Sequence, residues 1–490
     1  MTDSSILHDC KPFSSGNGMK VTADDEILFS NFTYNPDVYY FFYCGDIKAY
    51  YLNNFLTNVL QKAEAGREVQ FVAIVPDVFE QYAYKNILVV NPVVGKHWKA
   101  AQKNGEHDLP CVSCRIASAT FMSAVSGNAA IRSLIATILR NQSNLYLYLF
   151  ESVEEMTLDD IEGVTILGPD KRIAKQCNNK IWQYKQVGGL LPVAEHYFCD
   201  DVETLLIKTA ALRKEWTDGI FISCAYSAAG ANSIVSNNQE EVPGWCIGKE
   251  GTFLISRFIP HRLDPTVLAV VANEEDVYVA GVADQVIKNG NRFIGSTYPS
   301  VATAEQKALL YQYTVVIGKM LGKLGYRGIF GCDYIVADDG SIFFIEINAR
   351  KQGTTLEFCY TLEQALPKGT PGLPELEYHA VTENRFPENS IELKTTYDKL
   401  YWGTHNYKVL DQKNTRGYIP HNPYERKSFE NIATSELNHD FVVLEHIGAD
   451  FKVLPGTFLA RVVSVAVNRE KMETGLRQGV EFIKQTIGEA

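Results

Sequence analysis

The sequence lacks several features that would place it in a simple functional class. It has no run of about 18 uninterrupted apolar residues, the length that a membrane-spanning helix requires. Basic residues are outnumbered, with 46 Lys and Arg against 58 Asp and Glu and a net charge of −12. General nucleic-acid and anionic-membrane binders need a concentrated basic surface, so this composition argues against both. An anionic ligand would need a local pocket of lysine and arginine.

Zinc-like cysteine patterns and secretion signals are also scarce. Among ten scattered cysteines, only Cys111 and Cys114 have the spacing of zinc ligands, and no second pair follows at the usual distance. We expect buried, reduced thiols, with a zinc site as the lesser alternative. The N-terminal residues have no basic start followed by an apolar block, so they do not read as a secretory signal. The expected location is the cytoplasm.

The chain is predicted to divide into four segments. Residues 1–25 resemble a flexible lead-in, and residues 26–165 alternate strand-like and helix-like runs. This alternation is typical of a Rossmann-like α/β domain with a parallel sheet. Because the G-x-G-x-x-G turn is absent, no dinucleotide is assigned to it. Residues 166–260 and 261–490 are predicted to form α+β parts, the last with a C-terminal extension.

Three stretches of the later segments carry clear local predictions. Residues 170–189, DKRIAKQCNNKIWQYKQVGG, predict one basic helix that ends at paired glycines. Residues 302–325 predict a long helix. The proline-rich stretch 365–379 predicts a surface crossing.

The most informative stretch is GIFGCDYIVADDGSIFFIEINAR, which ends at Arg350. Two β-rich runs flank an Asp-Gly pair, which is a strong hairpin signal. A type I′ turn centred on Asp339 and Gly340 would place Asp333 directly opposite Glu346. The sequence therefore predicts two carboxylates facing each other across one hairpin.

Asn348 adds a third oxygen to this pair. It lies two residues after Glu346, and strand side chains alternate between faces, so both project to the same side. An unpaired buried carboxylate is costly, so we expect positive charge near Asp333, Glu346 and Asn348. Two carboxylates and an amide oxygen are ligands that Mg²⁺ prefers, with water and phosphate oxygens in its remaining positions. The alternative is a polar strand end in which one carboxylate is protonated.

Taken together, these features resemble the ATP-grasp ligases. The resemblance runs from about Gly168 to Arg350, and its most specific part is the aspartate, the hairpin and the Glu-x-Asn-x-Arg ending. It implies an ATP-grasp fold, in which two α+β subdomains clamp ATP, preceded by a Rossmann-like pre-ATP-grasp domain. Residues 166–260 would form the small or lid subdomain, and residues 261–490 the large subdomain.

The resemblance also implies roles for individual residues. The three oxygen ligands would hold one or two Mg²⁺ ions, or Mn²⁺, against the ATP phosphates. Arg350 would clamp a carboxylate or an acyl phosphate, although a solvent-exposed arginine at a strand end is the alternative. Lys180 matches the first nucleotide lysine of the family, with Lys175 as its rival.

The small-residue turn AYSAAGANS, residues 225–233, resembles the lid that covers the phosphates. Ser227 and Gly230 would let backbone N–H groups approach oxygen anions, although an ordinary hairpin is the alternative. Family members commonly carry a lysine on the strand before this turn, and GIFISC has none. Either another cation, Arg257 or Lys288, neutralises the α-phosphate, or nucleotide affinity is reduced.

The stretch GTFLISRFIP resembles the strand that frames the adenine pocket. A glutamate often found there is replaced by Ser256 and Arg257, so backbone groups of Arg257, Phe258 and Ile259 are expected to hold adenine. A later stretch, VADQVIKNGNRFIGSTYP, resembles amino-acid and peptide ligases of this superfamily.

The implied activity is ATP-dependent ligation of a carboxylic acid, of the amino-acid or short-peptide class, to an amine. ATP would phosphorylate the acid to an acyl phosphate, from which the amine expels phosphate. Arg350 and Lys288 are the expected catalytic cations, and we hypothesise that Arg461 lies near the acceptor. Small-molecule substrates are the expected partners, without nucleic acid or membrane, and homodimers are common among such ligases.

Two other interpretations stay open. A carboxylate–thiol ligase shares the first half-reaction and differs only in its acceptor. The missing strand lysine is also compatible with a nucleotide-binding module that no longer turns over. Retention of Asp333, Glu346, Asn348 and Arg350 favours turnover, because a binder would not need all four.

Overall fold

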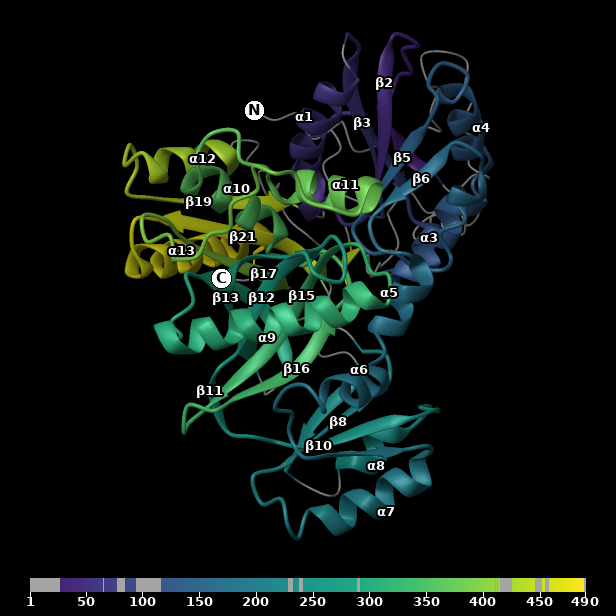
Figure 1. Ribbon diagram of the computed structural model, residues 1–490. Helices are drawn as coiled ribbons and strands as arrows, with labels where there is room; N and C mark the ends of the chain where they lie inside the picture. Colours follow the sequence, from purple (N-terminus) through teal and green to yellow (C-terminus); the bar gives the residue numbers. More distant parts are fainter. Residues whose placement is uncertain are drawn as a thin grey trace. The chain divides into compact units, whose positions relative to one another are not determined.

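The computed structural model contains the helices and strands labelled in Figure 1, and its chain divides into two compact units. The structure describes residues 27–64, 66–76, 84–93, 116–227, 232–237, 241–288, 291–409, 411, 413–414, 425–445, 452–453 and 458–488. The first unit comprises residues 1–171, 355–364 and 404–490, and the second comprises residues 172–354 and 365–403. The boundary after residue 171 lies close to the one predicted after residue 165. The predicted boundary after residue 260 stays a prediction.

The first unit contains a six-stranded sheet in the order β1-β4-β3-β2-β5-β6. Its strands are β1 (Ile27–Ser30), β2 (Val38–Cys44), β3 (Glu68–Val75), β4 (Ile87–Val90), β5 (Leu145–Leu149) and β6 (Val164–Leu167). Strand β1 is antiparallel to β4, and the remaining neighbours are parallel. All seven residues of β2 are buried, as expected for a strand covered on both faces. The predicted Rossmann-like sheet is confirmed.

Helices connect and cover these strands. They are η3 (Ile47–Leu52), α1 (Asn53–Ala63), α3 (Ser118–Gly127), α4 (Ala129–Ile138) and η5 (Leu158–Asp160). Asn128 separates α3 from α4 and caps the second helix, because its side chain accepts a hydrogen bond from the N–H of Ile131 at 3.0 Å. In the described part of the chain no single helix is long and apolar enough to cross a membrane, and only the bent pair α3 and α4 reaches that length and composition together.

C-terminal elements complete the first unit. They are α10 (Thr355–Ala365), β17 (Tyr401–Lys408), whose first residues belong to the second unit, β18 (Lys413–Asn414), α12 (Glu425–Ala433), β19 (His439–Glu445), β20 (Lys452–Val453), β21 (Phe458–Ala466) and α13 (Arg469–Ile487). Strands β19 and β21 pair antiparallel, and α13 packs on both. Gly475 and Gly479 allow this close approach, since a Cβ at Gly479 would lie 2.4 Å from Val462.

Three ionisable side chains are buried together in the first unit. Arg461 Nη2 lies 2.5 Å from Glu357 Oε1, and the two side chains are 2% and 0% exposed. Burial and the charge of Glu357 raise the pKa of Glu425 to about 8, although Arg461 opposes this shift. The structure thus places Arg461 in a buried ion pair, whereas the sequence hypothesis placed it near the acceptor amine.

We expect Glu425→Gln to raise the free energy of unfolding at pH 8 and to flatten its pH dependence. The pKa of Glu425 is raised from 4.5 to about 8 on folding, so between these values the folded protein binds more protons than the unfolded chain. The stability that this group contributes is therefore complete below pH 4.5 and is lost as the pH rises through about 8. Urea unfolding at several pH values measures this slope. Glu430→Gln, at an exposed position of the same helix, should keep the parent slope, and a parent profile without any slope would contradict the prediction.

The second unit contains two sheets. The smaller has the order β7-β10-β8-β9 and consists of β7 (His196–Cys199), β8 (Ile220–Cys224), β9 (Ser233–Ser236) and β10 (Phe253–Arg257), with α7 (Val202–Leu212) and α8 (Glu241–Cys246). The larger, antiparallel sheet contains β11 (His261–Leu263), β12 (Pro265–Val271), β13 (Val277–Lys288), β14 (Arg292–Tyr298), β15 (Gly328–Ala337) and β16 (Ile342–Asn348). Its helices are α9 (Ala304–Lys323) and α11 (Leu373–Glu383), and α5 (Lys171–Cys177) and α6 (Lys180–Val187) precede both sheets.

Two local predictions in this unit were wrong and one is confirmed. The single basic helix predicted at 170–189 is two helices, because Asn179 caps α6 by accepting a hydrogen bond from the N–H of Trp182 at 3.1 Å. The surface crossing predicted at 365–379 contains α11, which has a proline in its first turn. The long helix predicted at 302–325 is α9, and its N-terminus carries a capping box.

Candidate active site

The β15–β16 hairpin brings the two predicted carboxylates together. Asp333 pairs with Glu346 across the two strands, so the predicted partners are confirmed. Side chains directly opposite each other in an antiparallel pair have Cβ atoms about 4.5–5.5 Å apart. Both carboxylates therefore lie in one small volume.

The turn of this hairpin differs from the predicted type. A type I′ turn needs positive φ at both Asp339 and Gly340, and only Gly340 has it, with φ of 90°. Near the turn the pairing is shifted by one residue from the predicted register, and an irregularity at Ile345 restores it before Glu346. The irregularity offsets the shift near the turn, so Asp333 still pairs with Glu346. The Asp-Gly pair in the sequence did not indicate this bulge.

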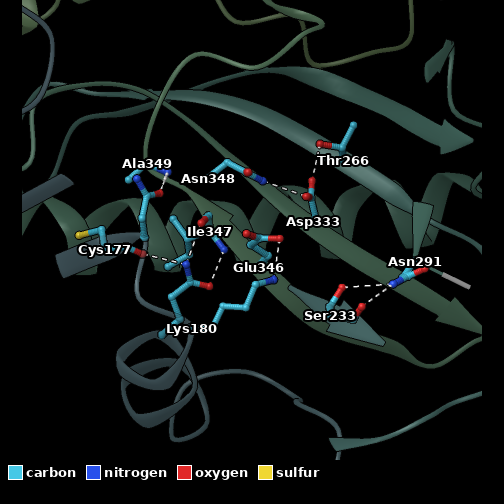
Figure 2. A network of polar contacts seen from close by, with 12 residues as sticks. Cys177, Lys180, Ser233, Thr266, Asn291, Asp333, Glu346, Ile347, Asn348 and Ala349 are labelled. Carbon is cyan, nitrogen blue, oxygen red and sulfur yellow. Dashed lines mark hydrogen bonds and ion pairs between the residues drawn. The ribbon is translucent and has the colours of Figure 1, made fainter. Parts of the chain in front are cut away.

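Five side chains around the hairpin form a polar network of three contacts, and Figure 2 shows two of these contacts. Lys180 Nζ lies 2.8 Å from Glu346 Oε2. Asn348 Nδ2 donates a hydrogen bond to Asp333 Oδ2 at 2.8 Å. Arg350 Nη2 donates to Asn348 Oδ1 at 3.0 Å. The strand end that looked unpaired in the sequence thus has positive charge beside it.

The electrostatics of Asp333 fit a cation site. Burial and the charge of Glu346 raise the pKa of Asp333 to about 6, whereas hydrogen bonds from Thr266 and Asn348 and the charge of Lys180 lower it. Neighbouring donors therefore do not fully compensate the two facing carboxylates. Among the described residues no group of three His, Cys, Asp or Glu side chains could hold a metal. Two carboxylates with an amide still fit Mg²⁺, provided that water or phosphate oxygens complete its octahedron.

Two amide side chains attach helix α6 and the residues just before it to the C-terminal end of β16. Gln183 is fully buried, and its amide donates to the C=O of Ile347 at 2.8 Å and accepts from its N–H at 2.9 Å. It therefore pairs with both backbone groups as a neighbouring strand would. Asn178 Oδ1 accepts from the N–H of Ala349 at 3.0 Å. Because Lys180 lies between these anchors in the chain, they hold it against the hairpin; the sequence interpretation missed both.

We expect Gln183→Leu to lower the free energy of unfolding and to weaken the binding of MgATP. Leucine has a similar volume, but it leaves the N–H and C=O of Ile347 without partners, at a cost of about 1–3 kcal/mol for each buried group. Urea unfolding and the thermal shift produced by MgATP measure the two effects. Gln186→Leu, at an exposed position of the same helix, is the matched control. Equal stability of the Gln183 variant and the parent would rule out this anchoring role.

The network lines a cavity of about 220 Å³ inside the second unit. Nine predicted site residues line it: Lys180, Ser227, Arg257, Phe258, Ile259, Asp333, Glu346, Asn348 and Arg350. Apolar side chains, including Tyr184, Phe221 and Ile335, form part of its wall, and polar ones, including Gln285 and Gln352, form another part. An apolar slot joined to a charged end suits a molecule with a planar base and phosphates.

The outcome differs among the remaining residues that the sequence interpretation named. Lys288 is exposed at the end of β13 and is not among the described residues that line the cavity, so its catalytic role stays a prediction. Gly230, like Cys111 and Cys114, falls outside the described residues. Lys175 is exposed on α5, which leaves Lys180 as the better match to the nucleotide lysine.

His261 lines the cavity and was missed by the sequence interpretation. Its Nδ1 lies 2.7 Å from the C=O of Ile259, and its Nε2 lies 3.0 Å from Asp264 Oδ1. Burial lowers the pKa of His261, but the hydrogen bonds to Asp264 and Ile259 outweigh this effect and leave it raised. Since a carbonyl and a carboxylate only accept, both ring nitrogens donate and the imidazolium form is favoured. The wall of the cavity thus contains a titratable side chain that the sequence interpretation did not indicate.

Known proteins resemble parts of this chain. A family model of the ATP-grasp domain matches residues 209–354. The ligase named for the butirosin acyl-carrier protein and L-glutamate, from Niallia circulans, is 24% identical over 207 residues, which cover 41% of this chain and 49% of that protein. The ligase named for L-propargylglycine and L-glutamate, from Streptantibioticus cattleyicolor, is 30% identical over 101 residues, or 20% of each chain. The chain thus spans about half or less of these curated relatives.

A solved structure resembles nearly the whole chain. The carboxyaminoimidazole ribonucleotide synthase of Aspergillus clavatus, complexed with ATP, aligns with a TM-score of 0.54 at 13% sequence identity. The alignment covers 92% of this chain and 100% of that one. At this sequence identity the similarity establishes the fold alone, and the chemistry has to be inferred from the residues of the site.

Proposed function

The chain has an ATP-grasp fold with a Rossmann-like domain before it, and from this premise we propose that it is an ATP-dependent ligase that joins a carboxylic acid to an amine. The observation that carries the proposal is the meeting of Asp333, Glu346 and Asn348 with Lys180 in one cavity. A site of this composition suits phosphoryl transfer, in which positioning and charge compensation supply most of the catalysis.

In the proposed complex, ATP occupies the cavity from its apolar wall to the hairpin. Adenine would pack against Phe221 and bind backbone groups of Arg257 to Ile259, and the phosphates would reach Lys180. Asp333, Glu346 and Asn348 would hold one or two Mg²⁺ ions. Bound metal supplies compensation of the negative charge on the transferring phosphoryl group.

Two balanced steps complete the reaction. A carboxylate oxygen of the acid attacks the γ-phosphorus, the bond to the bridging oxygen breaks, and ADP leaves while an acyl phosphate forms. The amine nitrogen then attacks the carbonyl carbon, phosphate leaves, and the nitrogen loses a proton. Arg350, half-buried and already directed toward Asn348, would bind the anionic oxygens of the acid and of the acyl phosphate.

The proposed substrates are small molecules of the amino-acid class. Both curated relatives are named for L-glutamate, so this amino acid is the first acid to test, with other amino acids as amines. A homodimer is proposed by analogy with related ligases alone.

The test is ADP release from MgATP in the presence of L-glutamate and a panel of amines. The proposal expects release that requires both an acid and an amine, with transfer of ¹⁸O from the labelled carboxylate to phosphate. Release that requires a thiol in place of the amine would favour a carboxylate–thiol ligase. Binding of MgATP without any release across the panel would favour the non-catalytic module.

A further inference from the structure

The glutamate of the carboxylate pair is already bound by a cation of the protein itself. Lys180 Nζ lies 2.8 Å from Glu346 Oε2, and the two side chains are only 5% and 18% exposed. Water screens so buried a contact weakly, so the attraction is stronger than that of a surface ion pair. Lys180 therefore holds one of the two oxygens that Glu346 could offer to a metal ion (Figure 2).

Asn348 is also turned away from metal binding. Its Nδ2 donates to Asp333 Oδ2, and its Oδ1 accepts from Arg350 Nη2. The guanidinium has only donors and an ionised carboxylate has only acceptors, so these neighbours together determine which way the amide points. A metal ion binds an amide through its oxygen, and here that oxygen is held by Arg350.

The oxygens of Asp333 have donors as well. Thr266 Oγ1 donates to Asp333 Oδ1 at 2.7 Å, and Gln352 Nε2 approaches the same oxygen at 3.4 Å. Asn348 holds Oδ2. Each of the three expected metal ligands thus has an internal partner in this arrangement, and two of these partners, Lys180 and Arg350, are cations.

The formal charge of the network determines which ligand can displace Lys180 and Arg350 from Glu346 and Asn348. Two carboxylates, one ammonium and one guanidinium give the network a formal charge of zero. A divalent ion entering alone would leave two excess positive charges in a partly buried cavity and would break the contacts of Lys180 and Arg350. The phosphates of a nucleotide bring negative charge and offer both cations new oxygens.

We propose that Lys180 and Arg350 compete with the divalent metal for Glu346 and Asn348, so that the metal binds tightly only together with a nucleotide. This inference rests on the metal site of the proposed function. The nucleotide draws the two cations onto its phosphates and frees the ligand oxygens. Thermodynamic linkage then requires that the metal strengthens nucleotide binding by the same factor by which the nucleotide strengthens metal binding.

The test measures Mn²⁺ binding in the absence of nucleotide, by the electron paramagnetic resonance of free Mn²⁺ in the presence of the full chain. The parent should bind Mn²⁺ weakly, and Lys180→Met should bind it about tenfold more tightly or better, within the usual range of coupling between sites. Lys180→Gln is a second variant, which keeps a donor near Glu346 and should show the same direction. Lys185→Met, at an exposed position of the same helix, should behave as the parent.

Two results would overturn the inference, and they differ in what they leave standing. Equal Mn²⁺ affinity of the parent and both Lys180 variants would remove the competition and leave the ligase proposal intact. Absence of Mn²⁺ binding to the parent and to all variants, even with ADP present, would remove the metal site itself and with it the basis of the proposed function.

Discussion

Asp333→Asn should reduce the rate of MgATP-dependent ADP release by about a thousandfold, since charge stabilisation by a bound metal accounts for several kcal/mol of the barrier. The substitution keeps the shape of the side chain and its contact with Thr266, and it removes one of the two facing carboxylates. Steady-state kcat with the acid and amine identified by the screen measures the effect.

The matched control for this prediction is Asp338→Asn, in the exposed turn of the same hairpin, which should retain the parent rate. Glu346→Gln should repeat the loss, because Glu346 is the cross-strand partner of Asp333. A folded Asp333→Asn variant with more than a tenth of the parent kcat would exclude Asp333 as a metal ligand in turnover.

Lys351→Met should lower the free energy of unfolding by about 3–5 kcal/mol, the usual cost of breaking a buried ion pair from one side. Lys351 Nζ lies 2.7 Å from Glu377 Oε2, and the side chains are 2% and 1% exposed. Glu377 also accepts a hydrogen bond from the N–H of Ile329 in β15 through Oε1. Without the ammonium, a buried carboxylate would remain uncompensated beneath the sheet that carries the site. Urea unfolding measures the loss.

A double variant tests the cause of that loss. Glu377→Gln removes the charge and keeps an acceptor for Ile329, so Lys351→Met combined with Glu377→Gln should regain most of the stability lost by Lys351→Met alone. Lys368→Met, at an exposed position, should change little. If the double variant were less stable than Lys351→Met alone, the uncompensated charge would not be the cause.

Several strands followed from local patterns in the sequence, whereas their order in the sheets did not. Continuous apolar runs such as β2 indicated the parallel sheet, and the Asp-Gly pair indicated the hairpin. The local prediction of one continuous helix at 170–189 was wrong because side-chain amides compete with backbone groups for hydrogen bonds. Asn178 and Asn179 break a helix that looks continuous in the sequence, because their side chains bind the N–H of Ala349, just after β16, and cap α6.

The candidate site was predictable where a short stretch contains both partners of a contact. Asp333, Glu346 and Asn348 lie on one hairpin, so periodicity alone brought them together. Contacts between distant segments gave no such signal. Gln183 binds the backbone of Ile347 across a sequence separation of 164 residues, so no pattern within either stretch indicated this contact.

The side chains that anchor α6 also affect the tendency of the protein to aggregate. Gln183 binds both backbone groups of Ile347 on the edge of β16 that faces away from β15, and Asn178 binds the N–H of Ala349 just after the strand. The N–H of Phe344 donates to the C=O of Pro192 on the same edge at 2.9 Å. An open strand edge with free N–H and C=O groups is a template on which a strand of another molecule can add. The residues that position Lys180 therefore also protect the apolar run of β16 from intermolecular β-pairing and aggregation.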